Sequence, residues 1–561
     1  MTLSWDEAVA RVTAPKQQFE LDDVTVAGVT YHAFKYAPQN MRQIFDSARP
    51  RGDQVFLVYE DERWTFADVM ANVDGLAAAL VSRYGVQKGD RVAIAMRNYP
   101  EWVIAFAAIL SIGAISVSFN AWWTEDETSF ALDDCAATVL IADRERVERA
   151  EPAWRRRATS VIAVRCAEVP DGVDRYEDVV ELGAPMPEVA IDPDDDATIL
   201  YTSGTTGFPK GAVSTHRAIV QSLMAFACRA AVESARLADG GGAAPPTLPP
   251  VFILAVPLFH VTGCIPVMLS CFTAGMELVM MYRWDPEMAL RLIEREKVTT
   301  FVGVPTQSWD LVESPNFAKY DTSSLSNIAG GGAPAPPALV KRVDEGFASG
   351  RPSIGYGMTE TNAYGPGNGG DDYVSHPTSA GHTVPILELE IRGDDDRAVP
   401  TGERGEIWFK GPNLIRGYWN RPDATAETIV DGWLRSGDIG HIDADGFIYV
   451  EDRAKDMVLR GGENIYCAEV EAAIYEHPAV YEAAVFGVPD ARLGEQVAAT
   501  VTLKEGQALS TEELQRHVAT KLAAFKVPTI VIFSEERLPR SAAGKILKRE
   551  LRDEYVAAHP G

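Results

Sequence analysis

The chain has 561 residues, of which 46% are hydrophobic and 24% are charged. This length exceeds what one hydrophobic core usually holds, and a typical domain of about 150 residues predicts roughly three to four structural units. The formal net charge of −28 disfavours nucleic acid as a partner, because nonspecific affinity for phosphate backbones comes mainly from Lys and Arg.

The cysteines and the chain ends indicate a reducing compartment. No CxxC pair occurs, so we expect neither disulfides nor a zinc site. The first residues lack the basic and apolar regions of a secretory signal, and the last residues carry no peroxisomal or prenylation signal. We therefore expect a cytoplasmic protein. Its six cysteines are Cys135, Cys166, Cys228, Cys264, Cys271 and Cys467.

Apolar runs of strand length alternate with helical patterns through most of the chain. Runs such as RVAIAMRN, ATVLIAD, FILAVPLF and TTFVGVPT, separated by helical segments, predict α/β layers with largely parallel sheets. The most apolar stretch, residues 102–119, contains serines and Gly113, and its pattern favours a buried helix and strand over a membrane span. The Gly/Pro-rich residues 237–250 predict a surface loop.

The pattern changes after Gly446. A compact block follows, in which short strands such as EAAVFGV and QVAATVTL mix with helices such as AEVEAAIYEH. We place a domain boundary near Arg453. The sequence thus predicts a large N-terminal domain of packed β-sheets and helices, residues 1–453, and a small α+β C-terminal domain, residues 454–561.

The strongest local motif is YTSGTTGFPKG at residues 201–211, which follows the apolar run ATIL. Glycines let backbone amides approach phosphate oxygens, hydroxyl groups add donors, and Lys210 adds positive charge. Pro209 stands where a Walker A loop needs Gly, so the segment predicts a polyphosphate cradle of another kind. Taken alone, such a loop is as often a flexible linker. The candidate residues are Thr202, Ser203, Gly204, Thr205, Thr206, Gly207 and Lys210.

Further motifs follow in order along the chain. They are PLFH at 257–260, GGGAP at 330–334, YGMTE at 356–360, GWLRSGD at 432–438, DRAKD at 452–456, GGENI at 461–465 and LPRSAAGK at 538–545. With residues 201–211, this series resembles the ANL superfamily of adenylate-forming enzymes, and within it the AMP-forming acyl-CoA synthetases. The resemblance implies a large N-terminal domain, a small mobile C-terminal domain, and an active site at their junction.

The resemblance assigns adenine and ribose to residues in four of these motifs. Tyr356 would cover one face of the base, and the GGGAP loop would let the other face lie against backbone. Asp438 would accept both ribose hydroxyls, with Arg453 as a second ribose or phosphate contact. As a bare pattern, Asp438 and Arg453 are equally consistent with a surface ion pair. The loop residues are Gly331, Gly332, Ala333 and Pro334.

Catalytic roles are also implied by the resemblance. Lys545 would bridge the substrate carboxylate and the α-phosphate, where its charge stabilises the transition state from which pyrophosphate leaves. Thr359 would donate to the α-phosphate, and Glu360 would hold Mg²⁺, which prefers hard oxygen ligands. His260 would stand at the acyl-site entrance and swing to open the thiol route, although a lone His in an apolar run is more often a core residue.

The expected acyl pocket is bordered by apolar or small residues, without Lys, Arg or Asp. An amino-acid substrate would leave its ammonium group desolvated and unpaired, at a cost of several kcal/mol. We therefore expect a hydrophobic acid, either a medium- to long-chain fatty acid or an arylalkanoic or other bulky ring-bearing acid. The pocket residues are Phe259, Val261, Gly263, Val302, Gly303, Gly331 and Met358.

A hinge at Lys455 is expected by analogy with the family. Rotation of the small domain would withdraw Lys545 and bring Gly461 and Gly462 against the entering thiol of coenzyme A. Hinges are a few residues that absorb large changes in φ and ψ. The alternative is that DRAKD is only a charged surface turn.

These observations predict an acid–thiol ligase that uses ATP, Mg²⁺ and coenzyme A to convert a hydrophobic acid into acyl-AMP and then acyl-CoA. An acyl-AMP ligase serving a carrier protein in trans and a luciferase-like oxygenase share the motifs. A non-enzymatic nucleotide-binding protein is disfavoured, because Lys545, Glu360 and Asp438 are intact. We expect no integral membrane association, while peripheral association with a membrane and a homodimer are left open.

Overall fold

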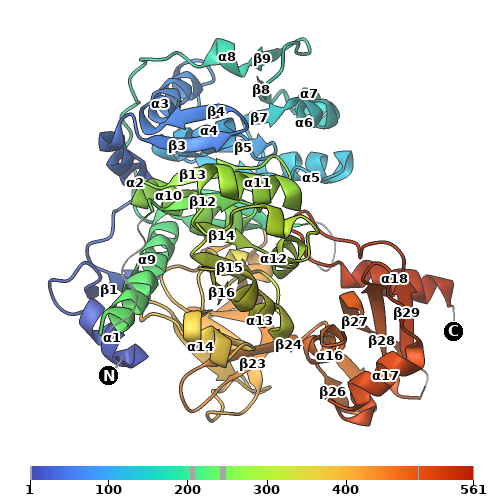
Figure 1. The fold of residues 1–561 in the computed structure, drawn as a ribbon. Helices are drawn as coiled ribbons and strands as arrows, with labels where there is room; N and C mark the ends of the chain where they lie inside the picture. The colour runs from blue at the N-terminus through green and yellow to red at the C-terminus, as the bar shows by residue number, and fades with distance from the viewer. Residues whose placement is uncertain (1–2, 203–208, 240–247, 491, 560–561) are drawn as a thin grey trace.

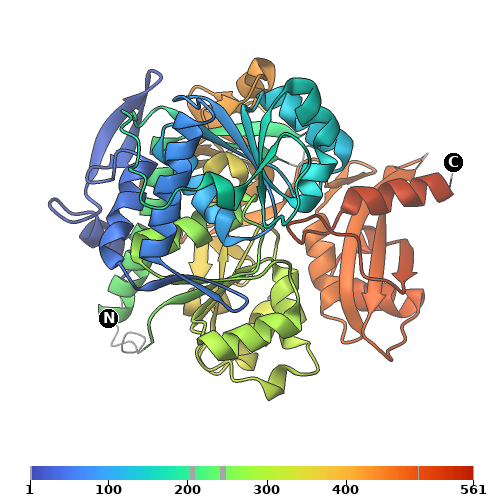
Figure 2. The same ribbon diagram turned by 90° about the horizontal axis from the view of Figure 1, so that it is seen from above.

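The computed structural model describes residues 3–202, 209–239, 248–490 and 492–559. A large N-terminal body contains two eight-stranded sheets and a smaller third sheet, and the C-terminal residues form a separate lobe with a sheet of its own. Figures 1 and 2 show this lobe, in red and orange, at one side of the body. The expected large N-terminal domain and small C-terminal domain are confirmed.

The first sheet has the order β21-β11-β10-β6-β5-β7-β8-β9. It is parallel from β10 to β9, and its last two pairings, β10–β11 and β11–β21, are antiparallel. Its strands are β5 (Arg91–Ala95), β6 (Ile115–Ser118), β7 (Val139–Asp143), β8 (Ser160–Val164), β9 (Val173–Arg175), β10 (Asp196–Thr202), β11 (Lys210–Thr215) and β21 (Gly417–Tyr418).

The second sheet has the order β17-β16-β15-β14-β12-β13-β3-β4 and is antiparallel only at its two edges. Largely parallel sheets, as predicted, therefore dominate the body. The strands are β3 (Val55–Tyr59), β4 (Glu62–Thr65), β12 (Val251–Leu254), β13 (Glu277–Met280), β14 (Thr300–Gly303), β15 (Asn327–Gly331), β16 (Arg351–Gly355) and β17 (Gly367–Gly369).

Alternate strand residues face different hydrophobic cores, as the pleat of a strand requires. In β5, Val92 and Ile94 belong to the core between the two sheets, whereas Ala93 and Ala95 belong to the core outside the first sheet. The inner core is filled by α2 (Met41–Ala48), α3 (Phe66–Ser82), α4 (Pro100–Ser111) and α9 (His216–Asp239). The outer faces carry α5 (Glu125–Cys135), α6 (Arg144–Arg149), α7 (Glu151–Arg157), α11 (Pro286–Glu296), α12 (Pro305–Val312) and α13 (Pro337–Gly346).

The most apolar stretch of the sequence lies in the inner core. It forms α4 and β6, all of whose residues are buried, so the prediction of a buried helix and strand is confirmed. One helix among the described residues, α9, contains a segment, His216–Leu237, that is long and apolar enough to cross a membrane. Half of its most apolar window is buried inside the protein, as in a core helix.

The third sheet leads into the C-terminal lobe. Its strand β24 ends at Arg453, a turn follows, and β25 begins the C-terminal sheet at Val458. The third sheet contains β18 (Ser379–Gly381), β19 (Glu388–Arg392), β20 (Gly405–Lys410), β22 (Ile429–Val430), β23 (Trp433–Ile442) and β24 (Ile448–Arg453). The lobe contains β25 (Val458–Arg460), β26 (Glu463–Ile465), β27 (Val480–Asp490), β28 (Gly494–Leu503), β29 (Ile530–Ser534), α16 (Cys467–Tyr475), α17 (Thr511–Ala519) and α18 (Lys548–Ala558).

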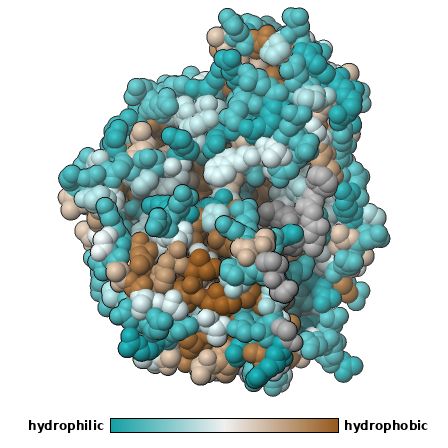
Figure 3. All heavy atoms as spheres, turned by 90° about the vertical axis from the view of Figure 1, so that its right-hand side faces the viewer, coloured by the Kyte–Doolittle hydropathy of each residue, from teal (hydrophilic) through white to brown (hydrophobic). Residues whose placement is uncertain are grey.

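Two faces of the C-terminal sheet are covered by separate small cores, one with α16 and α17 and the other with α18. The lobe can therefore hold its shape as a unit, because each face of its sheet is packed. Figure 3, which views this side of the molecule, shows a mainly hydrophilic surface with one compact hydrophobic area in a hollow.

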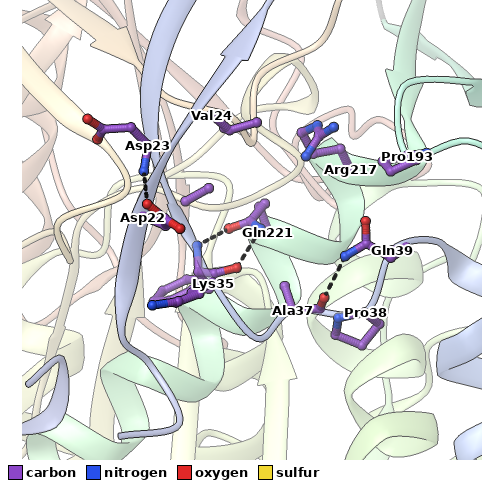
Figure 4. Close-up of a pocket in the computed structure, with 12 residues that line it drawn as sticks. Asp22, Asp23, Val24, Lys35, Ala37, Pro38, Gln39, Pro193, Arg217 and Gln221 are labelled. Atoms are coloured by element: carbon purple, nitrogen blue, oxygen red, sulfur yellow. Dashed lines mark hydrogen bonds between the residues drawn. The ribbon is translucent and has the colours of Figure 1, made fainter. Parts of the chain in front are cut away.

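A shallow pocket of about 140 Å³ lies at the N-terminal hairpin formed by β1 (Leu21–Val26) and β2 (Val29–Phe34). Its lining is polar and includes Lys35 and Gln221, and the Gln221 amide bonds the backbone of Phe34 and so ties β2 to α9 (Figure 4). None of the site residues expected from the sequence lines this pocket.

Candidate active site

Asp438 is a buried carboxylate at the centre of a polar cluster. It faces Arg453 across the antiparallel pair β23–β24, and the Arg453 Nε lies 3.2 Å from its Oδ1. The Tyr356 hydroxyl donates to its Oδ2 at 2.6 Å. Burial raises the pKa of Asp438, while the positive charge of Arg453 opposes this effect. Each carboxylate oxygen has two lone pairs, so both can still accept from ribose hydroxyls.

Glu360 is held by the edge of the first sheet. It lies with Thr359 in the short helix Thr359–Thr361, and its buried carboxylate accepts a 2.7 Å hydrogen bond from the Tyr418 hydroxyl. The ammonium of Lys210 lies 5.0 Å from the centroid of the Tyr418 ring. Tyr418 therefore links the phosphate-loop lysine to the expected metal ligand. Sequence analysis missed Tyr418, which carries no motif of its own.

The predicted phosphate loop begins and ends on paired strands. Thr202 in β10 faces Lys210 in β11, and its hydroxyl donates to the Lys210 carbonyl at 3.4 Å. The remaining predicted cradle residues, Ser203, Gly204, Thr205, Thr206 and Gly207, lie outside the described residues.

Lys545 is carried by a tight loop closed by a bridge between Arg540 and Ile546. Gly544 has φ +84°, a left-handed conformation that favours glycine. Arg540 donates to the Gly544 carbonyl at 3.0 Å and forms an ion pair with Glu482. The other oxygen of Glu482, which is buried in β27, accepts from the Leu538 N–H at 3.1 Å. Glu482 and Arg540 thus brace the lysine loop, and sequence analysis identified neither as a support.

The Lys545 side chain lies against the predicted adenine loop. A Cβ added at Gly332, where φ is +75°, would stand 3.1 Å from the lysine Cε. Gly332 therefore leaves room for the lysine. Burial lowers the pKa of Lys545 from 10.5 to about 8; Arg453 adds to this, while Asp438 and Glu360 oppose it. The structure thus brings Lys545, Arg453, Asp438 and Glu360 into one electrostatic site.

His260 lies beside this site. Burial, reinforced by the charge of Lys545, lowers the pKa of His260 to about 3, so its imidazole is neutral near neutral pH. Its Nδ1 accepts from the Thr262 N–H at 3.3 Å, which assigns the imidazole proton to Nε2. A neutral ring with an N–H donor can stand next to a lysine without charge repulsion.

The predicted acyl-pocket residues lie on four segments. Gly331 ends β15, and Met358 precedes the short helix Thr359–Thr361. Val302 and Gly303 end β14 opposite Ala329 and Gly330 of β15, while Phe259 and Val261 are buried ahead of the π-helical segment Gly263–Leu269. Val302 and Met358 are partly buried and pack against the inner core.

Two of the small residues serve packing. A Cβ at Gly263 would lie 2.3 Å from the Pro257 carbonyl oxygen, and a Cβ at Gly303 would lie 2.7 Å from the Gln307 Oε1 and from the Phe301 ring. At these two positions neighbouring atoms occupy the space next to the glycine, so neither glycine adds depth to a pocket.

The expected hinge and thiol-route residues lie in the two turns that follow Arg453. Gly461 and Gly462 are exposed in the turn between β25 and β26, with φ values of +60° and +88°. Lys455 lies in the turn between β24 and β25, where the Ala454 N–H donates to the Gly437 carbonyl. In this arrangement Lys545 is in the site and the two glycines are outside it.

Comparison with known protein families decides the class. The profile described as AMP-binding enzyme matches residues 44–419, and the profile described as AMP-binding enzyme C-terminal domain matches residues 469–545. The chain belongs to the AMP-binding enzyme family. The resemblance to adenylate-forming enzymes is confirmed.

Relatives agree over nearly the whole chain. A long-chain-fatty-acid–CoA ligase of Bacillus subtilis (strain 168) is 34% identical over 92% of this chain and 94% of its own. A feruloyl-CoA synthase of Amycolatopsis sp is 37% identical over 88% of this chain and 94% of its own. The crystal structure of the anthranilate CoA ligase AuaEII in complex with anthranoyl-AMP has a TM-score of 0.83 and 28% identity, covering 92% of this chain and 98% of that chain.

This AMP-binding enzyme is an acid–CoA ligase. It forms an acyl-adenylate from a carboxylic acid and ATP, and then transfers the acyl group to coenzyme A. The expected reaction class is confirmed.

The lowered pKa of Lys545 predicts a pH dependence. Since the free ammonium form is lost as pH rises through about 8, the kcat/KM of acid-dependent ATP–pyrophosphate exchange should fall across that range, because this parameter reports free-enzyme pKa values. Lys545→Arg should have a lower kcat/KM, but this value should not fall as pH rises, since a guanidinium stays protonated. Exchange rates measured from about pH 6 to about pH 10 test this, and identical profiles for both proteins would contradict it.

Proposed function

We propose that the acid is hydrophobic, either a medium- to long-chain fatty acid or a bulky ring-bearing acid. The apolar character of the candidate acyl side, formed by Phe259, Val302 and Met358 next to a neutral His260, carries this proposal. An acid with a second charged group would lose its hydration there without gaining an ion partner. The relatives named for long-chain fatty acid and ferulate support both branches.

Lys545 would act in the first half-reaction. A carboxylate oxygen of the acid attacks the α-phosphorus of ATP, the bond to the β-phosphate oxygen breaks, and pyrophosphate leaves. The Lys545 ammonium would offset the negative charge that gathers between the two anions, and Thr359 would donate to the α-phosphate. Its surroundings support this role, because Asp438 and Glu360 are close enough to favour the charged lysine despite its burial.

The nucleotide would lie between Tyr356 and the loop of residues 331–334, with its ribose on Asp438 and Arg453. The pairing of both Asp438 oxygens with Tyr356 and Arg453 supports this assignment, because it fixes the carboxylate in one orientation. The phosphates would extend toward Lys210, which stacks on Tyr418 at the end of the phosphate loop.

Glu360 would hold Mg²⁺. Among the described residues, no group of three or more His, Cys, Asp or Glu side chains forms an all-protein metal cage. A single buried carboxylate with one oxygen fixed by Tyr418 fits Mg²⁺, which usually takes one or two carboxylates together with substrate phosphates and waters. When bound, the ion would neutralise phosphate charge.

The second half-reaction would need another arrangement of the C-terminal lobe. The thiol of coenzyme A attacks the acyl carbon of the mixed anhydride, its proton is released, and AMP leaves. We place the hinge at Lys455, in the turn between β24 and β25, and the route of the thiol along Gly461 and Gly462. The exposure of both glycines while Lys545 is in the site supports a rotation that exchanges the two.

We place the reaction in the cytoplasm as part of the same proposal. All six cysteines are free thiols and buried, which suits a reducing compartment. Peripheral membrane association and a homodimer stay open alternatives.

The substrate class can be tested with a panel of acids. We expect CoA-dependent AMP formation with fatty acids of medium to long chain or with ring-bearing acids, and little with amino acids or dicarboxylic acids, because a second charge would be left without a partner. Coupled measurement of AMP and acyl-CoA checks this. Faster turnover of a charged or amino-bearing acid, or transfer only to a carrier protein, would contradict the proposal.

Asp438→Ala should raise the KM for ATP and lower turnover, because it removes the acceptor proposed for the ribose hydroxyls. The order of preference among acids should stay the same. Asp445→Ala, at an exposed turn of the same sheet, is the matched control and should behave like wild type. Steady-state kinetics with several acids provide the measurement, and a changed acid preference with unchanged ATP dependence would place Asp438 in the acyl pocket instead.

Lys455→Pro should leave ATP–pyrophosphate exchange within about tenfold of wild type while thioester formation collapses, because proline fixes φ near −65° and blocks a hinge. Gly462→Trp should likewise retain exchange and lose thioester formation, because the indole would fill the thiol route. Lys455→Ala and Gly462→Ala are the controls; the latter also isolates the strain of a side chain at φ +88°. Parallel losses in both half-reactions of the proline and tryptophan variants would refute the rotation.

A further inference from the structure

Helix α12 of the body contacts the C-terminal lobe along its whole length. At its start, the Thr306 hydroxyl donates to the Gly544 carbonyl at 3.4 Å, next to Lys545. Beyond its end, Glu313 lies 3.5 Å from the Lys504 ammonium. The helix follows β14 directly, so it begins at the edge of the candidate acyl pocket.

Asp310, in the middle of α12, makes the closest set of these contacts. Its Oδ1 accepts from the Tyr481 hydroxyl at 2.8 Å and from the Arg537 Nη1 at 2.9 Å. The Arg537 Nη2 also donates to the Tyr481 oxygen at 2.9 Å, so the three groups form a closed triangle. On the body side, the Trp284 Nε1 donates to the Asp310 Oδ2 at 3.0 Å.

Both donors belong to the C-terminal lobe, which also carries the lysine. Tyr481 lies in β27, next to Glu482, which braces the Lys545 loop through Arg540. Arg537 lies on the segment that runs into that loop. A displacement of the lobe therefore cannot move Lys545 without pulling both donors away from Asp310.

Burial makes this contact specific to one arrangement. The Asp310 side chain is only 6% exposed, whereas that of Arg537 is 58% exposed. Leaving a buried carboxylate without its charged donor costs more free energy than an exposed ion pair contributes. Hydrogen bonds to charged groups are also among the stronger ones. Trp284 would remain with Asp310 when the lobe leaves, but a single indole N–H cannot replace the guanidinium charge.

We propose that Asp310 is a positioning residue, which holds the C-terminal lobe in the arrangement that places Lys545 in the site through its bonds to Tyr481 and Arg537. The inference rests on the proposed role of Lys545 and on the proposed rotation. The same bonds have to break before the thiol can enter, so this contact favours acyl-adenylate formation and opposes thioester formation.

Variants of the lobe test this without disturbing the buried carboxylate side. Arg537→Gln and Tyr481→Phe should each lower acid-dependent ATP–pyrophosphate exchange by about tenfold or more, the scale of losing one hydrogen bond to a charged group. Thioester formation from supplied acyl-AMP and coenzyme A should stay at or above the wild-type rate. Arg537→Lys keeps the charge and should recover part of the exchange activity.

Arg552→Gln is the matched control. Arg552 pairs at 3.4 Å with Glu495 inside the lobe and is 43% exposed, so its loss removes a similar charge without touching α12. The double variant Asp310→Asn/Arg537→Gln should lower the rate of ATP–pyrophosphate exchange by less than the product of the two single fold-losses. The effects of two substitutions that remove the same interaction are not additive.

Lys545→Ala separates failure of this inference from failure of the proposed function. That variant should lower exchange by at least about a hundredfold and largely spare thioester formation. If it does not, the role of Lys545 falls. If it does, but Arg537→Gln matches Arg552→Gln in exchange, or loses both half-reactions in parallel, the positioning role of Asp310 is overturned.

Discussion

The structure depends on placing one lysine, from a loop of the C-terminal lobe, into a polar site on the N-terminal body. An ammonium group taken out of water is costly, and the lowered pKa of Lys545, about 8, records that cost. Asp438 and Glu360 offset it in part, while Arg453 adds to it. A partly desolvated ammonium group is stabilised most by nearby negative charge, and the proposed role of Lys545 in adenylation would supply that charge as a polyphosphate and a carboxylate.

Much of the architecture could be predicted from local pattern. Apolar runs of strand length between helical segments predicted the parallel layers. Such runs arise because both faces of a strand like β5 are buried, with Ile94 in one core and Ala95 in the other. The stretch that forms α4 was recognisable by its composition, since it is buried all round. Motif order then indicated which side chains share a site, and the structure places Lys545 with Asp438, Arg453 and Glu360.

The supports of these side chains could not be predicted, because each is defined by contacts distant in sequence. Glu482 braces Arg540 from 58 residues away, and Asp310 pairs with Arg537 from 227 residues away. Neither carboxylate belongs to a motif, and each resembles an ordinary surface charge in the sequence. The same limit applies to Gly263 and Gly303, since a missing side chain indicates either open space or a close neighbour, and only the fold shows which.

One segment connects the candidate acyl pocket to helix α12, which contacts the C-terminal lobe. Residues Val302 and Gly303 end β14, Val304 follows, and α12 begins at Pro305. A Cβ at Gly544 would lie 2.8 Å from a methyl group of Val304, so the lysine loop rests on the residue between pocket and helix. Close-packed interiors transmit small displacements instead of absorbing them. A shift at the end of β14 therefore reaches both Lys545 and Asp310, so the proposed acyl pocket and the contact with the lobe share the same short stretch of chain.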